Sequence, residues 1–192
     1  MEGTIMTKTV VIYHSGYGHT KVVAEHVARG AGAGDADLIA ISADGDITEA
    51  DWAELNSADA IIFGTPTYMG NVSWQFKKFA DATSPLWFER KWQDKVFGGF
   101  TISASSNGDK QVALITLQTL ASQHGGIWVS LGLAPSSNKS STYADVNNMG
   151  GSVGLLARAP ADAGVDEIHT GDLETAILYG KRVAYIAERL RG

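Results

Sequence analysis

The stretch Lys8–Lys21 reads KTVVIYHSGYGHTK, and the rest of the chain is organised around it. Its first half, Val10–Tyr13, is a short apolar and β-branched run, which is typical of a buried strand. A loop rich in glycine and hydroxyl side chains follows, and a helix-like segment then runs to about Ala31. The stretch therefore predicts a strand, a tight loop and a helix in direct succession.

The loop Ser15–Thr20 has the features of a phosphate-binding turn. The helix that follows it begins with unpaired N–H groups and the positive end of a dipole. Its two glycines let the backbone curve tightly around an anion. No Lys or Arg occurs in the loop before Lys21, so neutral donors would hold a terminal phosphate monoester, including the hydroxyl groups of Ser15, Tyr17 and Thr20.

An ordinary strand-to-helix turn is the alternative, because glycine and serine are common in such turns. Three hydroxyl side chains next to glycines at a helix start favour phosphate. The stretch contains neither G-x-x-x-x-G-K-[ST] nor G-x-G-x-x-G, which excludes a nucleoside-triphosphate loop and a dinucleotide fingerprint.

Composition bounds the class of protein. A chain of 192 residues is long enough for one α/β domain, which we expect over residues 6–192, with residues 1–5 as a leader. The net charge of −6 argues against nucleic acid and anionic membranes as partners. Because there is no cysteine, disulfides, thiolate catalysis and cysteine-bound metals are excluded. We see no signal peptide and no membrane-spanning stretch, so we expect a cytoplasmic protein.

The order of predicted elements indicates the fold class, a doubly wound five-stranded parallel sheet. Helix patterns separate the strands, with Ser73 and Asp172 as expected N-caps, a loop or short helix at residues 44–56 and an irregular segment at residues 83–94. The predicted helices cover residues 21–31, 74–81, 110–123 and 173–190. The predicted strands cover residues 10–13, 36–41, 59–65, 95–103 and 127–131.

Ligands in such sheets bind beyond the carboxyl ends of the strands. Three loops follow strand ends and are expected to converge on one pocket: Ser15–Thr20, Pro66–Asn71 and Ala104–Asp109. The segment Leu133–Gly154 is too long for a simple connection, and we expect it to be functional or interfacial.

Several segments, taken in order, resemble the flavodoxin-like FMN proteins of the WrbA-type NAD(P)H:quinone oxidoreductase family. The resemblance rests on the phosphate loop and on three further motifs: GTPTYMGN at residues 64–71, TLASQHG at 119–125 and MGGS at 149–152. It runs from Lys8 to the end of the chain. The sequence departs from the family at Ser103–Lys110, which is more polar than the family's glycine-rich loop, and at Val153–Leu156.

The resemblance implies an FMN site. The FMN phosphate would be bound by Ser15, Tyr17, Gly18, His19 and Thr20. The flavin ring would be lined by Pro66, Thr67, Tyr68, Gly70 and Asn71. The ribityl chain and ring edge would be held by Ser103, Ala104, Ser105, Ser106, Asn107 and Gly108.

Two further residues would complete the site on the substrate side. Trp87 would lie near the open flavin face, and His124 would be the catalytic residue, hydrogen-bonded to a quinone oxygen and able to supply a proton. Tyr68, Trp87 and His124 each also have a purely structural explanation. Tyr68 and Trp87 fit surface or core aromatics, and His124 fits a helix C-terminus, where a cation suits the dipole.

The implied activity is hydride transfer from NADH or NADPH to a quinone, by a ping-pong scheme at the flavin, in a homotetramer or dimer. Leu133–Gly154 and Trp87–Trp92 are the expected subunit contacts. One alternative is a flavodoxin-like electron carrier without its own substrate, and another is an FMN-dependent regulatory protein.

Overall fold

The computed structural model describes residues 7–32 and 38–191. The expected leader, residues 1–5, Met6 as the expected start of the domain, and the beginning of the predicted second strand, residues 36 and 37, lie outside the described residues.

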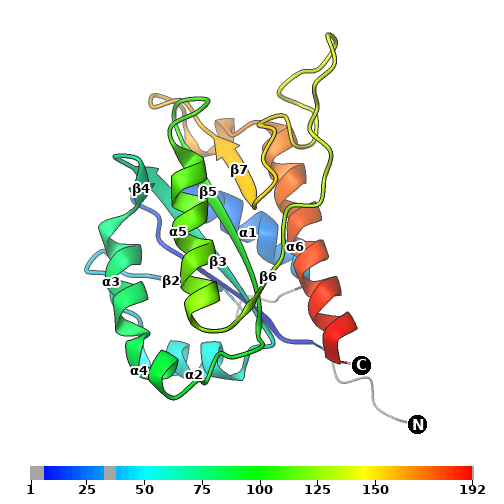
Figure 1. Ribbon diagram of the computed structural model, residues 1–192. Coiled ribbons are helices and arrows are strands. Elements are labelled where there is room, and N and C mark those ends of the chain that lie inside the picture. The colour runs from blue at the N-terminus through cyan, green and yellow to red at the C-terminus, as the bar shows by residue number, and fades with distance from the viewer. Residues whose placement is uncertain (1–6, 33–37, 192) are drawn as a thin grey trace.

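A parallel sheet forms the centre of the molecule (Figure 1). Its strands run in the order β2-β1-β3-β5-β6, and every neighbouring pair along this path is parallel. This confirms the predicted doubly wound, flavodoxin-like class. The strands are β1 (Thr9–Tyr13), β2 (Leu38–Ala40), β3 (Ala60–Tyr68), β5 (Val96–Ser103) and β6 (Ile127–Trp128).

The fifth strand position is split between two segments. β6 pairs with the start of β5, where Ile127 lies opposite Val96, and β7 (Leu155–Arg158) pairs with its end, where Leu155 lies opposite Phe100. Residues 129–154 form an insertion between the two halves. The strand predicted over residues 127–131 is present but shorter than expected. Val129 still donates to the carbonyl of Phe97 in β5 at 2.8 Å, whereas Leu131 donates to Ser152 at 3.0 Å instead of to β5.

The hydroxyl group of Tyr179 fills the break. It accepts a hydrogen bond from the N–H of Gly99 in β5 at 3.0 Å and donates one to the carbonyl of Val129 at 2.8 Å. Tyr179 is completely buried, and burial raises the pKa of its phenol. Two backbone groups that an uninterrupted ladder would pair are thus satisfied by one side chain.

Helices cover both faces of the sheet. α1 (His19–Ala31) and α6 (Thr170–Arg191) lie on one face, while α2 (Glu49–Ser57), α3 (Trp74–Ala82) and α5 (Lys110–Gln123) lie on the other (Figure 1). The segment expected to be a loop or short helix is α2. The segment expected to be irregular contains the short helix α4 (Ser84–Phe88).

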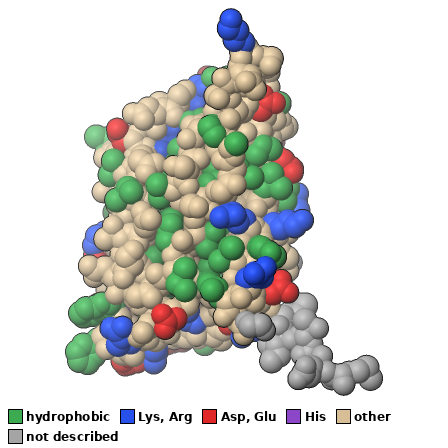
Figure 2. Space-filling model, turned by 45° about the vertical axis from the view of Figure 1, so that its right-hand side comes forward, with side chains coloured by type: hydrophobic (Ala, Val, Ile, Leu, Met, Phe, Trp, Pro, Cys, Tyr) green, Lys and Arg blue, Asp and Glu red, His purple; other side chains and the backbone are tan. Residues whose placement is uncertain are grey.

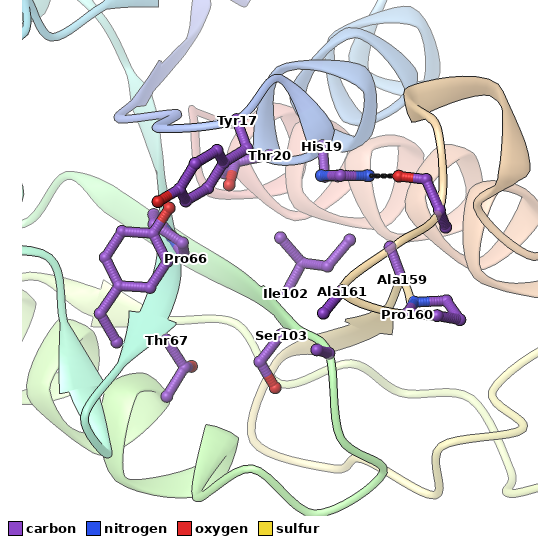
Figure 3. A pocket seen from close by; sticks show the side chains of 13 residues that line it. Tyr17, His19, Thr20, Pro66, Thr67, Ile102, Ser103, Ala159, Pro160 and Ala161 are labelled. Atoms are coloured by element: carbon purple, nitrogen blue, oxygen red, sulfur yellow. Dashed lines mark hydrogen bonds between the residues drawn. The ribbon is translucent and has the colours of Figure 1, made fainter.

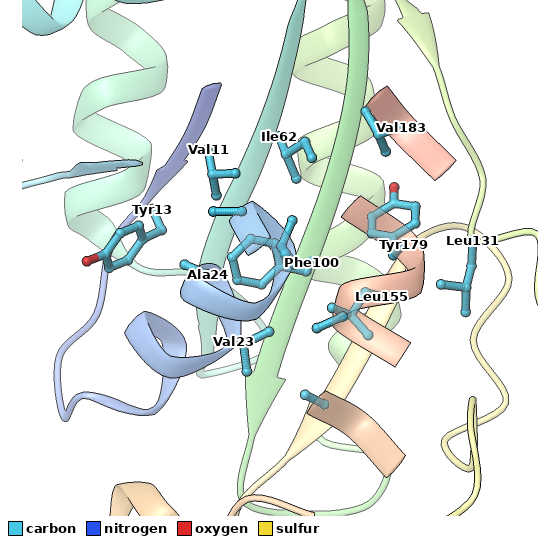
Figure 4. Close-up of a cluster of buried hydrophobic side chains, with 14 of the residues drawn as sticks. Val11, Tyr13, Val23, Ala24, Ile62, Phe100, Leu131, Leu155, Tyr179 and Val183 are labelled. Atoms are coloured by element: carbon cyan, nitrogen blue, oxygen red, sulfur yellow. The ribbon is translucent and has the colours of Figure 1, made fainter. Parts of the chain in front are cut away.

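The core has one cluster on each side of the sheet. Figure 4 shows the first, in which Val11, Ile62 and Phe100 from three adjacent strands pack against Val23 of α1 and Tyr179 of α6. The neighbouring strand residues face the second cluster, beneath α3 and α5. Burial on both faces explains why these strands read as continuous apolar runs.

α1 and α6 cross at very close range. A Cβ atom on Gly180 would lie 1.9 Å from the carbonyl oxygen of Val27, and one on Gly30 would lie 1.9 Å from that of Ile177. Only glycine fits at these two positions, and the close crossing holds the start of α1 against the sheet.

The two predicted helix caps have different outcomes. Ser73 caps α3 as expected, since its hydroxyl accepts a hydrogen bond from the N–H of Phe76 at 3.3 Å. The Asp172 prediction was wrong, because α6 starts at Thr170 and Asp172 lies inside its first turn. Its buried carboxylate instead accepts from the N–H of Arg158 in β7 at 2.8 Å and the side chain of Asn148 at 2.9 Å.

The insertion projects from the body of the molecule as a long loop (Figures 1 and 2). Its base is anchored by Asn147, whose side chain donates to the carbonyls of Leu133 and Gly151. A role in subunit contact stays a prediction. No helix among the described residues has both the length and the apolar character to cross a membrane.

Candidate functional site

A cavity of about 660 Å³ opens at the carboxyl ends of β1, β3 and β5 (Figure 3). Each of the three predicted loops contributes to its lining, so they do converge. The lining residues from the predicted set are Tyr17, His19, Thr20, Pro66, Thr67, Tyr68, Ser103 and Ala104. The remaining lining residues are Ile102, Ala159, Pro160, Ala161 and Ala163.

Ser15 holds the loop after β1, although neither Ser15 nor Gly18 lines the cavity. Its hydroxyl oxygen accepts hydrogen bonds from the N–H groups of Gly18 at 3.1 Å and Lys21 at 3.2 Å. Gly18 stands at φ 94°, in the left-handed region, where glycine carries no steric cost. Ser15 and Gly18 thus shape the loop, and the Ser15 hydroxyl proton stays available to a ligand.

The chemistry at the start of α1 fits a phosphate. His19 and Thr20 open the helix, and the amides of a first turn have no carbonyl within the helix to bond. Thr20 is almost fully buried and lines the cavity. None of the lining residues is acidic, so the dipole end of α1 faces no competing carboxylate.

The loop after β3 is a tight hairpin. β3 runs on to Tyr68 and pairs antiparallel with β4 (Asn71–Val72). The two central residues, Met69 at φ 48° and Gly70 at φ 81°, are both left-handed, which is the geometry of a type I′ turn. Pro66 and Thr67 line the cavity. The Thr67 hydroxyl lies 2.7 Å from that of Thr101, which is completely buried beside the lining.

Gly70 and Asn71 stand outside the cavity lining. The side-chain oxygen of Asn71 accepts hydrogen bonds from the hydroxyl of Thr116 on α5 and from the N–H of Val72, each at 2.8 Å. Asn71 therefore fastens the hairpin to α5. A direct contact of these two residues with a flavin stays a prediction.

Two tyrosines form an aromatic wall at the mouth of the cavity. The rings of Tyr17 and Tyr68 meet edge to face, with centroids 6.3 Å apart and planes at 72°. A Cβ atom on Gly16 would lie 2.5 Å from the Tyr68 hydroxyl, so the ring lies directly over Gly16. Burial, with a smaller contribution from Tyr17, raises the pKa of Tyr68. An aromatic wall of this kind suits a planar ligand.

The third loop reaches the cavity only at its start, where Ser103, the last residue of β5, and Ala104, the residue after it, belong to the lining. Ser105, Ser106, Asn107 and Gly108 lie beyond the lining, and their contact with a cofactor stays a prediction. Beneath them lies Lys110, which is completely buried. Its ammonium donates to the carbonyls of Ser105, Ser106 and Asn107, and burial lowers the pKa of Lys110 to about 8.

Sequence reasoning did not single out Lys110, which reads as an ordinary first residue of a helix. It also missed a fourth segment of the site, Ala159–Ala163, which follows β7. Its lining residues are small and apolar, and its one charged residue, Asp162, lies outside the cavity lining. His19 reaches it from α1, with Nε2 at 3.1 Å from the carbonyl oxygen of Ala163 (Figure 3).

Trp87 and His124 line a second cavity, of about 520 Å³, between α4 and α5. His124 follows the last residue of α5, whose 14 residues separate it from the third loop by about 21 Å. Its Nε2 lies 2.9 Å from the Thr83 hydroxyl, and burial lowers the pKa of His124. Within one chain, the structure does not bring these two residues to the first cavity.

The described residues contain no cluster of three or more His, Asp or Glu side chains that could hold a metal ion. The site is therefore built from backbone amides, hydroxyl groups and aromatic rings. These groups fit the phosphate, the ribityl chain and the planar ring of FMN.

The comparisons with known proteins agree with this geometry. Residues 7–139 match the family described as "NADPH-dependent FMN reductase". Flavodoxin FldP of Pseudomonas aeruginosa is 62% identical over 185 residues, covering 96% of this chain and 99% of that protein. An NAD(P)H dehydrogenase (quinone) of Archaeoglobus fulgidus is 32% identical over 206 residues, covering 96% of this chain and all of that protein.

A solved structure extends the likeness to three dimensions. The crystal structure of a flavodoxin, WrbA-like protein from Agrobacterium tumefaciens is 54% identical in sequence and superimposes with a TM-score of 0.79, covering 95% of this chain and 98% of that one. The family match covers more than half of the chain, and each of these relatives covers at least 95% of it. The chain therefore belongs to the NADPH-dependent FMN reductase family and has the flavodoxin-like fold.

Proposed function

We propose that the chain is an FMN-dependent NAD(P)H:quinone oxidoreductase, which passes two electrons as hydride from NADH or NADPH to a quinone. The observation that carries the proposal is the first cavity itself. It has an anion-binding helix start at one end, hydroxyl groups along its floor and an aromatic wall at its mouth.

Each part of the cavity has a role towards FMN. Ser15, Thr20 and the first amides of α1 would hold the phosphate, and the Ala159–Ala163 segment would close over it. Thr67 and Ser103 would face the ribityl chain. When bound, FMN supplies the ability to accept and donate hydride, and the protein binds it, orients it and excludes water.

The open side of the cavity supports a substrate role. Tyr17 is 81% exposed and Tyr68 is 38% exposed, so the aromatic wall remains in contact with solvent. A nicotinamide and then a quinone would stack in turn against the same open face. If both substrates use this one face, the oxidised nicotinamide must leave before the quinone binds, and the kinetics are then ping-pong.

Spectra and kinetics test the proposal together. Purified protein loaded with FMN should lose its flavin absorbance on addition of NADH or NADPH and regain it with benzoquinone. Double-reciprocal plots at several quinone concentrations should be parallel. Flavin bands that do not bleach with either nicotinamide would contradict the enzyme.

An electron carrier is the second candidate, because the 62% identical relative is named a flavodoxin. A carrier would take electrons singly and would have no quinone turnover of its own. A redox titration of the FMN-loaded protein in two well-separated one-electron waves would favour the carrier. A single two-electron wave would favour the enzyme.

The predicted catalytic role of His124 now requires a homo-oligomer. Within one chain, the length of α5, about 21 Å, separates His124 from the third loop, and His124 does not line the first cavity. Exposed Trp87, Phe88 and Ile115 lie on or near the second cavity and provide apolar surface for self-association. A dimer or tetramer in light scattering, together with a slower quinone rate in His124→Ala, would support this part of the proposal.

A further inference from the structure

Two lysines flank β5, and the ammonium of each donates hydrogen bonds to backbone carbonyls. Lys95 lies immediately before the strand, and its ammonium donates to the backbone carbonyls of Asn56 and Ala58. Lys110 follows the loop after the strand and donates to three consecutive carbonyls. Lys95 is at the end of the sheet away from the cavity, while Lys110 is at the cavity end.

The environment of Lys110 is unusual for a charged group. The residue is completely buried, although the loop that covers it is exposed. Besides burial, two charged groups act on the pKa of Lys110. The carboxylate of Asp172 in α6 raises this pKa, and the guanidinium of Arg158 in β7 lowers it. The Asp172 carboxylate already accepts hydrogen bonds from the backbone N–H of Arg158 and the side-chain amide of Asn148. Among the described residues, no carboxylate lies within ion-pair distance of the Lys110 ammonium.

A buried ammonium without an ion pair costs stability, and an apolar residue of similar volume would avoid that cost. The hydrogen bonds to the loop do not by themselves explain why position 110 is a lysine. The loop is exposed, so water could satisfy the same carbonyls. The position therefore suggests a role that stability alone does not require.

The three hydrogen bonds determine how the loop faces outward. In a planar trans peptide the C=O and N–H bonds point in opposite directions. Since the carbonyls of residues 105, 106 and 107 turn inward to one ammonium, the N–H groups of Ser106, Asn107 and Gly108 turn away from it. Successive amides that point to one side form a concave donor surface for an electron-rich ligand.

We infer that Lys110 is a positioning residue of the FMN site: it sets the third loop as an amide cradle for the pyrimidine edge of the flavin and supplies fixed positive charge behind it. The inference rests on the proposed FMN site and deepens it. The pyrimidine edge carries carbonyl oxygens and gains negative charge on two-electron reduction. A cation held behind the cradle therefore strengthens binding and favours the reduced cofactor.

The test compares Lys110→Met with Lys95→Met, a control that removes a similar carbonyl-bound ammonium from the opposite end of β5. FMN affinity is measured by quenching of flavin fluorescence at pH 7, and the midpoint potential of the bound flavin by dye-coupled titration. Lys110→Met should weaken FMN binding by at least about tenfold and lower the potential. Lys95→Met should leave the FMN affinity within about twofold of wild type and the midpoint potential unchanged, whatever it does to the free energy of unfolding.

The wild-type protein offers a second measurement that needs no variant. Because the pKa of Lys110 is about 8, FMN affinity should fall as the pH rises from 7 to 9. The same titration of Lys110→Met, or of Lys110→Gln, should be flat by comparison. This pH profile distinguishes a positioning charge from a residue that merely fills space.

The outcomes separate this inference from the proposed function. If wild type binds FMN and reduces quinone but Lys110→Met matches Lys95→Met in affinity, potential and pH profile, the role of Lys110 is disproved and the enzyme stands. If wild type binds no FMN, both are overturned. If FMN binds and Lys110 behaves as expected without quinone turnover, only the proposed activity fails.

Discussion

Nε2 of His19 lies 3.1 Å from the carbonyl oxygen of Ala163, and this hydrogen bond joins two segments that are 144 residues apart in the chain. One is the start of α1, where the phosphate is expected. The other is the segment after β7, which forms the outer wall of the cavity. Val165 packs nearby, since a Cβ atom on Gly18 would lie 2.8 Å from its Cγ1.

His19→Ala should therefore loosen the outer wall of the site. Loss of one hydrogen bond of this kind is worth about 1 kcal/mol, so FMN binding should weaken about fivefold, mainly through faster release. Stopped-flow release of FMN measures this. His26→Ala is the matched control, because the His26 ring bonds to Val22 within the same helix at 2.8 Å. Equal FMN release rates for the two variants would show that the hydrogen bond between His19 and Ala163 does not help to hold FMN.

Gly16→Ala should displace the Tyr68 ring. The new Cβ atom would lie 2.5 Å from the Tyr68 hydroxyl but at least 3.4 Å from the ring carbons. Because that hydroxyl is the end of a partly exposed side chain, the fold should tolerate the change. Loss of the aromatic wall should weaken FMN binding by about three- to tenfold.

A double variant isolates this contact. In a Tyr68→Phe background the clashing oxygen is absent, so adding Gly16→Ala should cost no further FMN affinity. Fluorescence titrations of the two single variants and the double variant form a double-mutant cycle. Additive losses would show that Gly16 acts on the phosphate loop alone and not through Tyr68.

Tyr179→Phe should destabilise the fold at the split strand. It would leave the N–H of Gly99 and the carbonyl of Val129 without the hydroxyl that bridges them. Both groups are in the core, so the free energy of unfolding should fall by about 2–4 kcal/mol. Urea denaturation measures it. Tyr185→Phe, on the exposed side of the same helix, should change it by no more than about 0.5 kcal/mol.

The stability of the FMN-free protein should depend on pH through Lys110. Its pKa in the fold, about 8, is below the ordinary value of 10.5. Between these values the unfolded chain binds more protons than the folded one, so the contribution of Lys110 to the unfolding free energy rises with pH. Below pH 8 the cost of burying the ammonium is fully present.

Comparison with Lys110→Met isolates this contribution from other titrating groups. The unfolding free energy of wild type relative to the variant should be greater at pH 9.5 than at pH 7. Urea titrations at the two pH values measure it. If the difference in unfolding free energy between wild type and Lys110→Met is the same at both pH values, burial of the Lys110 ammonium does not destabilise the fold.

The local pattern of the sequence determined most of the fold. Alternation of apolar strand runs with helical segments indicated the parallel sheet, because a strand buried on both faces has no polar side. The glycine- and hydroxyl-rich loop after Val10–Tyr13 predicted a phosphate site, and three of its residues do line the cavity. These features depend on residues close together in the chain, and Tyr17, Thr20, Thr67 and Tyr68 do meet as expected.

Tertiary structure alone decided the rest. At the split of the fifth strand, Tyr179 bonds a carbonyl 50 residues away in the chain, and no local sequence pattern predicts that contact. The outer wall of the cavity is made of small apolar residues whose only distinction is their position. His124 and Trp87 share a cavity, but α5 carries them away from the first one, since a helix sets distance by its length. Lys110 became significant only when folding placed three carbonyls around one buried ammonium.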